Sequence, residues 1–132
     1  MANGWYTLGL NKDLGALIDW DTDTIACAGF RTSAYTVNLV TDEFLSDAGT
    51  PVATVDLAGG AIASGAVDFT DFTWASVGAG AAIDALVFYK NTGVAATSPL
   101  LLYVDTATGL PVTPTGSNID FAVNVLGLFS AA

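Results

Sequence analysis

Three aspartates at alternate positions, Asp19, Asp21 and Asp23, have the spacing that comes closest to a chemical site. Alternate aspartates can direct several carboxylate oxygens onto one Ca²⁺ ion. An EF-hand loop beginning at Asp19 would need Gly at its sixth position and Glu at its twelfth, where this chain has Thr24 and Phe30. The pattern therefore leaves two interpretations: a looser calcium site, or a solvated acidic turn that leads into a strand, and we favour the turn.

The sequence lacks the residue types and motifs on which most enzymes depend for catalysis. The chain has no histidine, which removes the commonest general base and the usual activator of serine or cysteine nucleophiles. The single cysteine, Cys27, lies in an apolar run, which indicates a buried and inert thiol. Asp42 and Glu43 are better explained as charges at the start of a helix than as catalytic carboxylates. We therefore expect no enzymatic activity and no cofactor.

Large apolar groups near both ends of the chain are candidates for an interface. Residues 1–20 are a candidate interface arm. Trp5 and Trp20 flank the helical segment expected within this arm and are candidate anchors, since tryptophan is enriched where proteins bind one another. Packing of that segment onto its own domain is the equally weighted alternative. The candidate interface residues at the two ends of the chain are Trp5, Tyr6, Trp20, Leu126, Leu128 and Phe129.

Short strands separated by turn signals dominate the rest of the chain. Residues 84–105 predict two strands, each apolar on both faces, joined by a Gly/Thr/Ser/Pro connection. Strands are also expected near residues 24–32, 51–57, 61–63, 67–69, 72–74 and 119–125. This pattern predicts one all-β domain over residues 1–132, a β-sandwich or jelly-roll-like fold. Its core is expected to include Leu86, Phe88, Leu101, Tyr103, Phe121 and Val123.

Two short helical segments are expected beside these strands. Residues 11–19 are predicted to form one or two turns, with Leu14, Leu17 and Ile18 on one face, although Gly15 weakens this prediction. Residues 41–46 are predicted to form a short helix. Thr41 would cap it, and the acidic residues after Thr41 would lie in its first turn.

Composition limits the partners. The chain is 52% hydrophobic but only 12% charged, so we expect some apolar surface to be buried against partner subunits. A homo-oligomer is therefore expected; our preference for a trimer among oligomers does not follow from composition. Its net charge of −10 includes only three basic residues, which argues against binding to nucleic acid or to an anionic membrane. No basic segment of a signal peptide is visible after Met1, and the charge-free runs are too short to span a membrane.

An ordered set of segments carries a resemblance that composition does not. It includes residues 18–25, 35–38 and 67–74, the block Asp42-Glu-Phe-Leu-Ser-Asp47, and the stretch Leu86-Val-Phe-Tyr-Lys-Asn-Thr-Gly-Val-Ala-Ala-Thr-Ser-Pro99. Over nearly its whole length the chain resembles a widespread group of small virion structural proteins of tailed bacteriophages, usually encoded close to the major capsid protein. The group is defined by the order and spacing of segments, so no active-site residue is implied.

The resemblance implies a capsid decoration, or cement, protein. It would be made in the host cytoplasm, bind the major capsid protein on the outside of the head, and stabilise the shell. A tail or head-to-tail structural protein is the first alternative. A receptor-binding or glycan-binding module of the virion is another, in which Trp5, Tyr6, Trp20 and Tyr35 would serve as exposed aromatics. The missing basic face favours the outer surface of a head over a position against packaged DNA.

Overall fold

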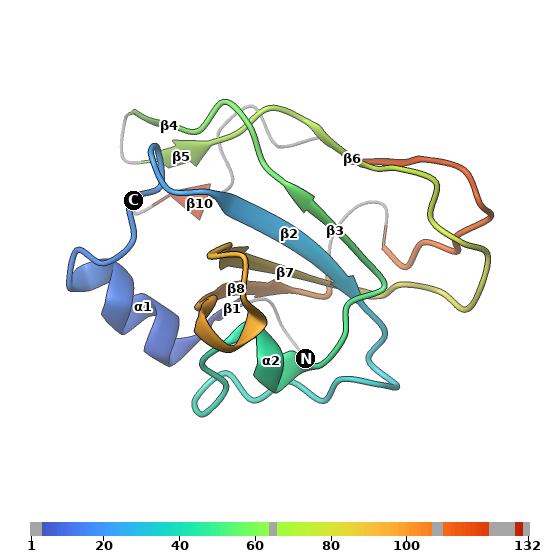
Figure 1. Cartoon of the computed structure of the whole chain (residues 1–132), viewed down its shortest axis with the longest axis horizontal. Coiled ribbons are helices and arrows are strands. Elements are labelled where there is room, and N and C mark those ends of the chain that lie inside the picture. The colour runs from blue at the N-terminus through green and yellow to red at the C-terminus, as the bar shows by residue number, and fades with distance from the viewer. Residues whose placement is uncertain (1–3, 64–65, 107–109, 122–128, 131–132) are drawn as a thin grey trace.

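The structure is a computed structural model that describes residues 4–63, 66–106, 110–121 and 129–130 (Figure 1). Its elements in chain order are β1 (Gly4–Trp5), α1 (Thr7–Leu14), β2 (Ile25–Phe30), α2 (Leu45–Ala48), β3 (Ala53–Asp56), β4 (Ala61–Ala63), β5 (Ala66–Asp68), β6 (Phe72–Trp74), β7 (Ala85–Lys90), the 3₁₀ turn η1 (Ala95–Thr97), β8 (Leu100–Val104), β9 (Ile119–Phe121) and β10 (Phe129–Ser130). Strands outnumber helices, and every strand pairing is antiparallel. The predicted all-β fold is confirmed.

A five-stranded sheet organises the molecule. Its strand order is β1-β8-β7-β2-β3, so the two apolar strands predicted from residues 84–105 are neighbours near its middle. The β2–β7 pairing is continuous from Ile25 opposite Lys90 to Phe30 opposite Ala85. A shift in register between Phe88 and Tyr89 interrupts the β7–β8 pairing. Because β7 and β2 are flanked by strands on both sides and covered on both faces, nearly all of their residues are buried.

Alternate residues of the central strands enter two separate cores. On one face, Ile25, Cys27, Leu86 and Phe88 pack with Phe72, Trp74 and other residues of the smaller strands. On the other face, Ala26, Ala28, Val87 and Tyr89 pack with Tyr6, Tyr35 and Leu45 from the helical side. This alternation follows from the two-residue period of a strand and explains why the sequence pattern is apolar on both faces.

Two small sheets accompany the large one. β10-β5-β4 forms a three-stranded sheet and β6-β9 a two-stranded sheet. In Figure 1, β4, β5 and β6 lie above the five-stranded sheet, and α1, η1 and α2 lie below it. Gly29 on β2 allows the closest approach, because a Cβ atom there would lie 2.5 Å from the ring of Trp74. The small sheets thus cover one face of the five-stranded sheet, and helices cover the other face.

The helices differ from the predicted ones. The first begins at Thr7 and ends at Leu14, so residues 11–19 are only partly helical; Gly15 follows it and Ala16 has a positive φ of 63°. Leu14, Leu17 and Ile18 were expected on one face, but Ile18 is buried whereas Leu14 and Leu17 are 77% and 63% exposed. The helix forms earlier because Gly9 lets it lie directly on β8, where a Cβ atom would clash with the Leu100 carbonyl oxygen.

The second helix, by contrast, is displaced toward the C-terminus relative to the prediction. It spans Leu45–Ala48, and Thr41 does not cap it. Instead, Oδ2 of Asp47 accepts hydrogen bonds from the backbone N–H groups of Glu43 (2.9 Å) and Phe44 (3.0 Å). These bonds lower the pKa of Asp47 below its ordinary value.

The expected core residues fall into three groups. Leu86, Phe88, Leu101 and Tyr103 are buried as predicted. Phe121 is only partly buried, stacked on Phe72 with ring centroids 5.3 Å apart. Its strand, β9, pairs only with β6 among the described strands, and its ring also meets that of Trp74 edge to face, with centroids 4.9 Å apart. Val123 lies outside the described residues.

Candidate functional site

The structure places the N-terminal aromatic residues within the fold. Tyr6 and Trp20 are 0% and 4% exposed, so neither side chain is available to a partner as an interface anchor. Trp5 is partly buried and contacts Trp20 edge to face, with ring centroids 6.0 Å apart. Because β1 pairs with β8, residues 4 and 5 belong to the large sheet rather than to a separate arm.

The C-terminal candidates are described only in part. Leu126 and Leu128 lie outside the described residues. Phe129 belongs to β10, where its backbone pairs with Val67 of β5. The chain therefore returns to the small sheet at this position.

The three alternate aspartates form a hydrogen-bonded turn. Oδ2 of Asp23 accepts the backbone N–H of Asp19 at 2.8 Å and lies 3.2 Å from Nζ of Lys90. A hydrogen bond between the side chains of Asp19 and Asp21 lowers the pKa of Asp19 and raises that of Asp21. Within the described ranges, no three His, Cys, Asp or Glu residues are arranged to hold a metal ion. The contacts of Asp23 with the turn and with Lys90 favour the solvated acidic turn, and the calcium site stays an untested prediction.

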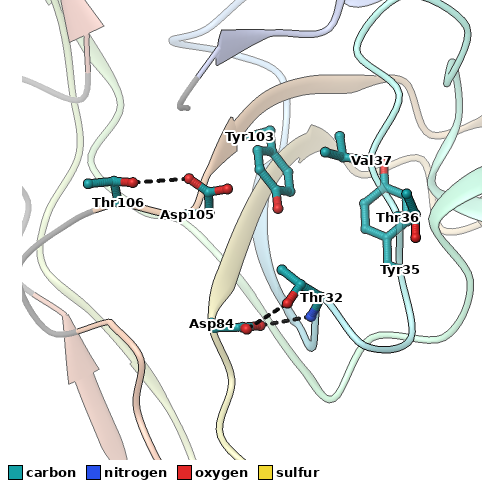
Figure 2. Close-up of a pocket in the computed structure, with 8 residues that line it drawn as sticks. All are labelled: Thr32, Tyr35, Thr36, Val37, Asp84, Tyr103, Asp105 and Thr106. Atoms are coloured by element: carbon teal, nitrogen blue, oxygen red, sulfur yellow. Dashed lines mark hydrogen bonds between the residues drawn. The ribbon is translucent and has the colours of Figure 1, made fainter. Parts of the chain in front are cut away.

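A hollow of about 460 Å³ lies elsewhere, at the end of the sheet where β7 begins and β8 ends. Thr32 and residues 35–37 line one side, and Asp84, Tyr103, Asp105 and Thr106 line the rest. Figure 2 shows the Tyr103 side chain between Asp105 and Tyr35, with its hydroxyl pointing toward Thr32. We call this hollow the Asp84 pocket.

Hydrogen bonds hold Asp84 in a defined position. Its Oδ1 accepts the backbone N–H of Thr32 at 2.8 Å, and its Oδ2 accepts the Thr32 hydroxyl at 2.7 Å (Figure 2). Burial alone would raise the pKa of Asp84, but the two bonds from Thr32 outweigh it and lower the pKa below its usual range. Asp84 is therefore an anion at neutral pH.

A second network holds the opposite wall. The Tyr35 hydroxyl donates to Oδ2 of Asp42 at 2.7 Å and lies 2.8 Å from the hydroxyl of the buried Tyr6. Oδ2 of Asp42 also accepts the backbone N–H of Asn38 at 2.9 Å. Residues 35–42 are thus tied to the core beneath the pocket.

The chemistry of the pocket suits binding better than proton transfer. Burial, followed by the negative charge of Asp105, raises the pKa of Tyr103 to about 12, so its phenol stays neutral at physiological pH. Asp84, with its lowered pKa, is a weak base. Tyr35 and Tyr103 are 5% and 1% exposed, so they offer little ring surface for stacking on a sugar. The pocket presents carboxylates and hydroxyls, which accept hydrogen bonds from donors.

Sequence reasoning missed this pocket, although a signal for it exists. Asp84 and Asp105 stand immediately before and immediately after the two central strands. In an antiparallel hairpin these two positions meet at the same end, and Leu86 indeed lies opposite Val104. The other wall, formed by Thr32 and residues 35–37 of the loop after β2, has no comparable signal in the sequence.

Most of the large exposed apolar side chains belong to segments on the helical side. Leu14, Leu17, Val40 and Val94 belong to α1, its following turn, the loop before α2 and the loop before η1. Ile62 on β4 belongs to the opposite side. Among the described residues these five are the large apolar side chains with the greatest exposure.

No family model matches the chain, and no curated protein matches it. Over the part of the chain that the structure describes, no helix is long and apolar enough to cross a membrane.

Proposed function

We propose that the chain is a non-enzymatic structural protein of a tailed-bacteriophage virion, a decoration protein that binds the outside of the head and reinforces it. The observation that carries this proposal is the ordered set of segments resembling such proteins. Its most specific stretch, residues 86–99, includes most of β7 and the connection toward β8. Its Asp42–Asp47 block contains the Asp47 cap of α2.

The distribution of charge supports a position on the outer surface. The sequence has thirteen acidic residues and only three basic ones. Two of the basic residues, Lys12 and Lys90, form ion pairs with Glu43 and Asp23, respectively. A surface of this kind repels the phosphates of packaged DNA. The partner would be the major capsid protein, with the decoration protein arranged as a homo-oligomer, preferably a trimer.

The helical side supports a contact with the shell. Leu14 and Leu17, three positions apart in sequence, are both exposed in a chain with few charges. Exposed apolar side chains that gather on one side are a common feature of protein–protein contacts. In our proposal α1 and its following turn make this contact, in place of the buried Tyr6 and Trp20.

The proposal is tested with purified heads that lack the protein. Mature heads and their unexpanded precursors are incubated with it, and bound protein is measured after sedimentation. We expect binding to mature heads and a higher temperature of genome release, because a ligand that binds only the intact shell stabilises it. Heads that release their genome at the same temperature with and without bound protein would contradict reinforcement.

A further inference from the structure

We propose that the Asp84 pocket receives a basic side chain of the protein partner, with arginine favoured over lysine. This inference rests on the proposed function, since the partner is then a subunit of the shell. It names the chemistry of one contact, which is separate from the apolar contact at Leu14 and Leu17.

The charge of the pocket calls for a cationic ligand. Its lining includes two carboxylates, Asp84 and Asp105, and no basic residue. The three basic side chains of the whole sequence are engaged elsewhere: Lys12 with Glu43, Lys90 with Asp23, and Arg31 with the carbonyl oxygen of Ala81. An anionic ligand would be repelled by both carboxylates.

Asp84 retains capacity for a ligand although Thr32 already binds it. Thr32 gives one donor to each carboxylate oxygen, and each oxygen has a second lone pair for another donor. The bonds from Thr32 also fix the plane of the carboxylate. An incoming cation therefore meets a charge that is already oriented, which reduces the entropy lost on binding.

The arrangement of acceptors favours a guanidinium. The Thr36 hydroxyl and the Asp105 carboxylate line the hollow as well as Asp84, and Oδ1 of Asp105 already accepts the Thr106 hydroxyl at 3.1 Å (Figure 2). Arginine offers five N–H donors in a planar fork, whereas lysine offers three from a single nitrogen. The hollow, about 460 Å³ in volume, lies within the range of about 300–1,000 Å³ that is usual for ligand pockets.

The first experiment titrates ¹⁵N-labelled full-length protein at constant ionic strength and follows its amide resonances. The probes are N-acetyl-arginine methylamide, the lysine equivalent, the neutral citrulline equivalent, and CaCl₂. We expect the arginine probe to shift the amides of Thr32, Asp84 and Asp105 with a dissociation constant in the millimolar range, and citrulline to bind about tenfold more weakly or not at all. Equal binding of citrulline, or tighter binding of Ca²⁺ at the same amides, would overturn the inference.

Matched variants separate a specific pocket from general attraction to an acidic protein. Asp105→Asn and Asp84→Asn each remove one charge from the pocket, and Asp68→Asn removes one from the exposed face of β5. We expect both pocket variants to weaken the arginine probe about fivefold or more, with Asp68→Asn near wild type. Equal weakening by all three variants would show that only net charge matters and would overturn the inference.

Binding to heads distinguishes this inference from the proposed function. If the wild type binds mature heads and Asp105→Asn binds them much more weakly, both stand. If both proteins bind heads equally, the proposed function stands and the pocket does not receive a shell residue. If neither binds any head, the proposed function fails, and the occupant named here fails with it.

Discussion

Gly29 shows at the residue scale how closely the small strands meet the large sheet. The ring of Trp74 lies where a Cβ atom of residue 29 would stand, and Trp74 donates its Nε1–H to the carbonyl oxygen of Cys27. Both positions are buried. A larger residue at position 29 must displace the indole or the strand.

We predict that Gly29→Ala lowers the free energy of unfolding by about 1–3 kcal/mol, as overpacking of a core does. Gly78→Ala is the matched control, because nothing lies within 4 Å of its added Cβ atom. Urea unfolding of the two variants measures the difference. Equal stability of the two would mean that Trp74 does not pack on β2 as described.

The four tyrosines give a second prediction at this scale. Burial raises the pKa of each of them, with hydrogen bonding adding to the effect at Tyr35. The folded protein therefore keeps phenol protons that the unfolded chain releases near pH 10. These groups do not change the free energy of unfolding below about pH 10, and they lower it as the pH rises further.

The measurement is a titration of phenolate absorbance. We expect each tyrosine to ionise at a higher pH in the folded protein than in concentrated urea, where all four titrate near pH 10. A folded protein whose tyrosines titrate near pH 10 would be inconsistent with their burial.

Helix α2 provides a test at the element scale, because sequence and structure assign different caps. We predict that Asp47→Ala costs about 0.5–2 kcal/mol of stability, since the N–H groups of Glu43 and Phe44 lose their acceptor. Thr41→Ala, at the position expected from sequence, should cost less than about 0.5 kcal/mol. Thermal unfolding measures both, and a larger loss for Thr41→Ala would restore the cap predicted from sequence.

Strands were predictable from this sequence, and helices were less so. Continuous apolar runs predict β7 and β8, because both faces of these strands are buried. Helix α1 depends on a tertiary contact, the approach of Gly9 to Leu100, that no local pattern contains. In isolation Gly9 disfavours a helix, so local propensity places the helix too late in the chain.

Only the wall of the pocket that contains Asp84 and Asp105 was predictable from the sequence. The hairpin formed by β7 and β8 brings Asp84 and Asp105 to one end of the sheet by simple antiparallel geometry. Thr32 and Tyr35 arrive from a loop whose path depends on hydrogen bonds to Asp84 and Asp42. Such contacts between distant segments are set by the whole fold, so a single sequence does not reveal them.

At the scale of the whole molecule, the sheet separates two cores, and the exposed apolar groups lie mainly on the helical side. We predict that Leu14→Ser combined with Leu17→Ser weakens binding to mature heads more than about fivefold, as loss of an apolar anchor does. Stability should change little, because both side chains are exposed in the monomer. Ile62→Ser on β4 is the matched control, and equal binding by both variants would remove the helical side from the contact.

The position of the protein on the particle tests the central claim most directly. Electron cryo-microscopy of the parent virion, with and without this chain, would reveal which density it contributes. We predict additional density on the outer surface of the head, in many copies, with the helical side toward the shell. Density confined to the tail or the head-to-tail junction, or a virion from which the protein is absent, would contradict the account.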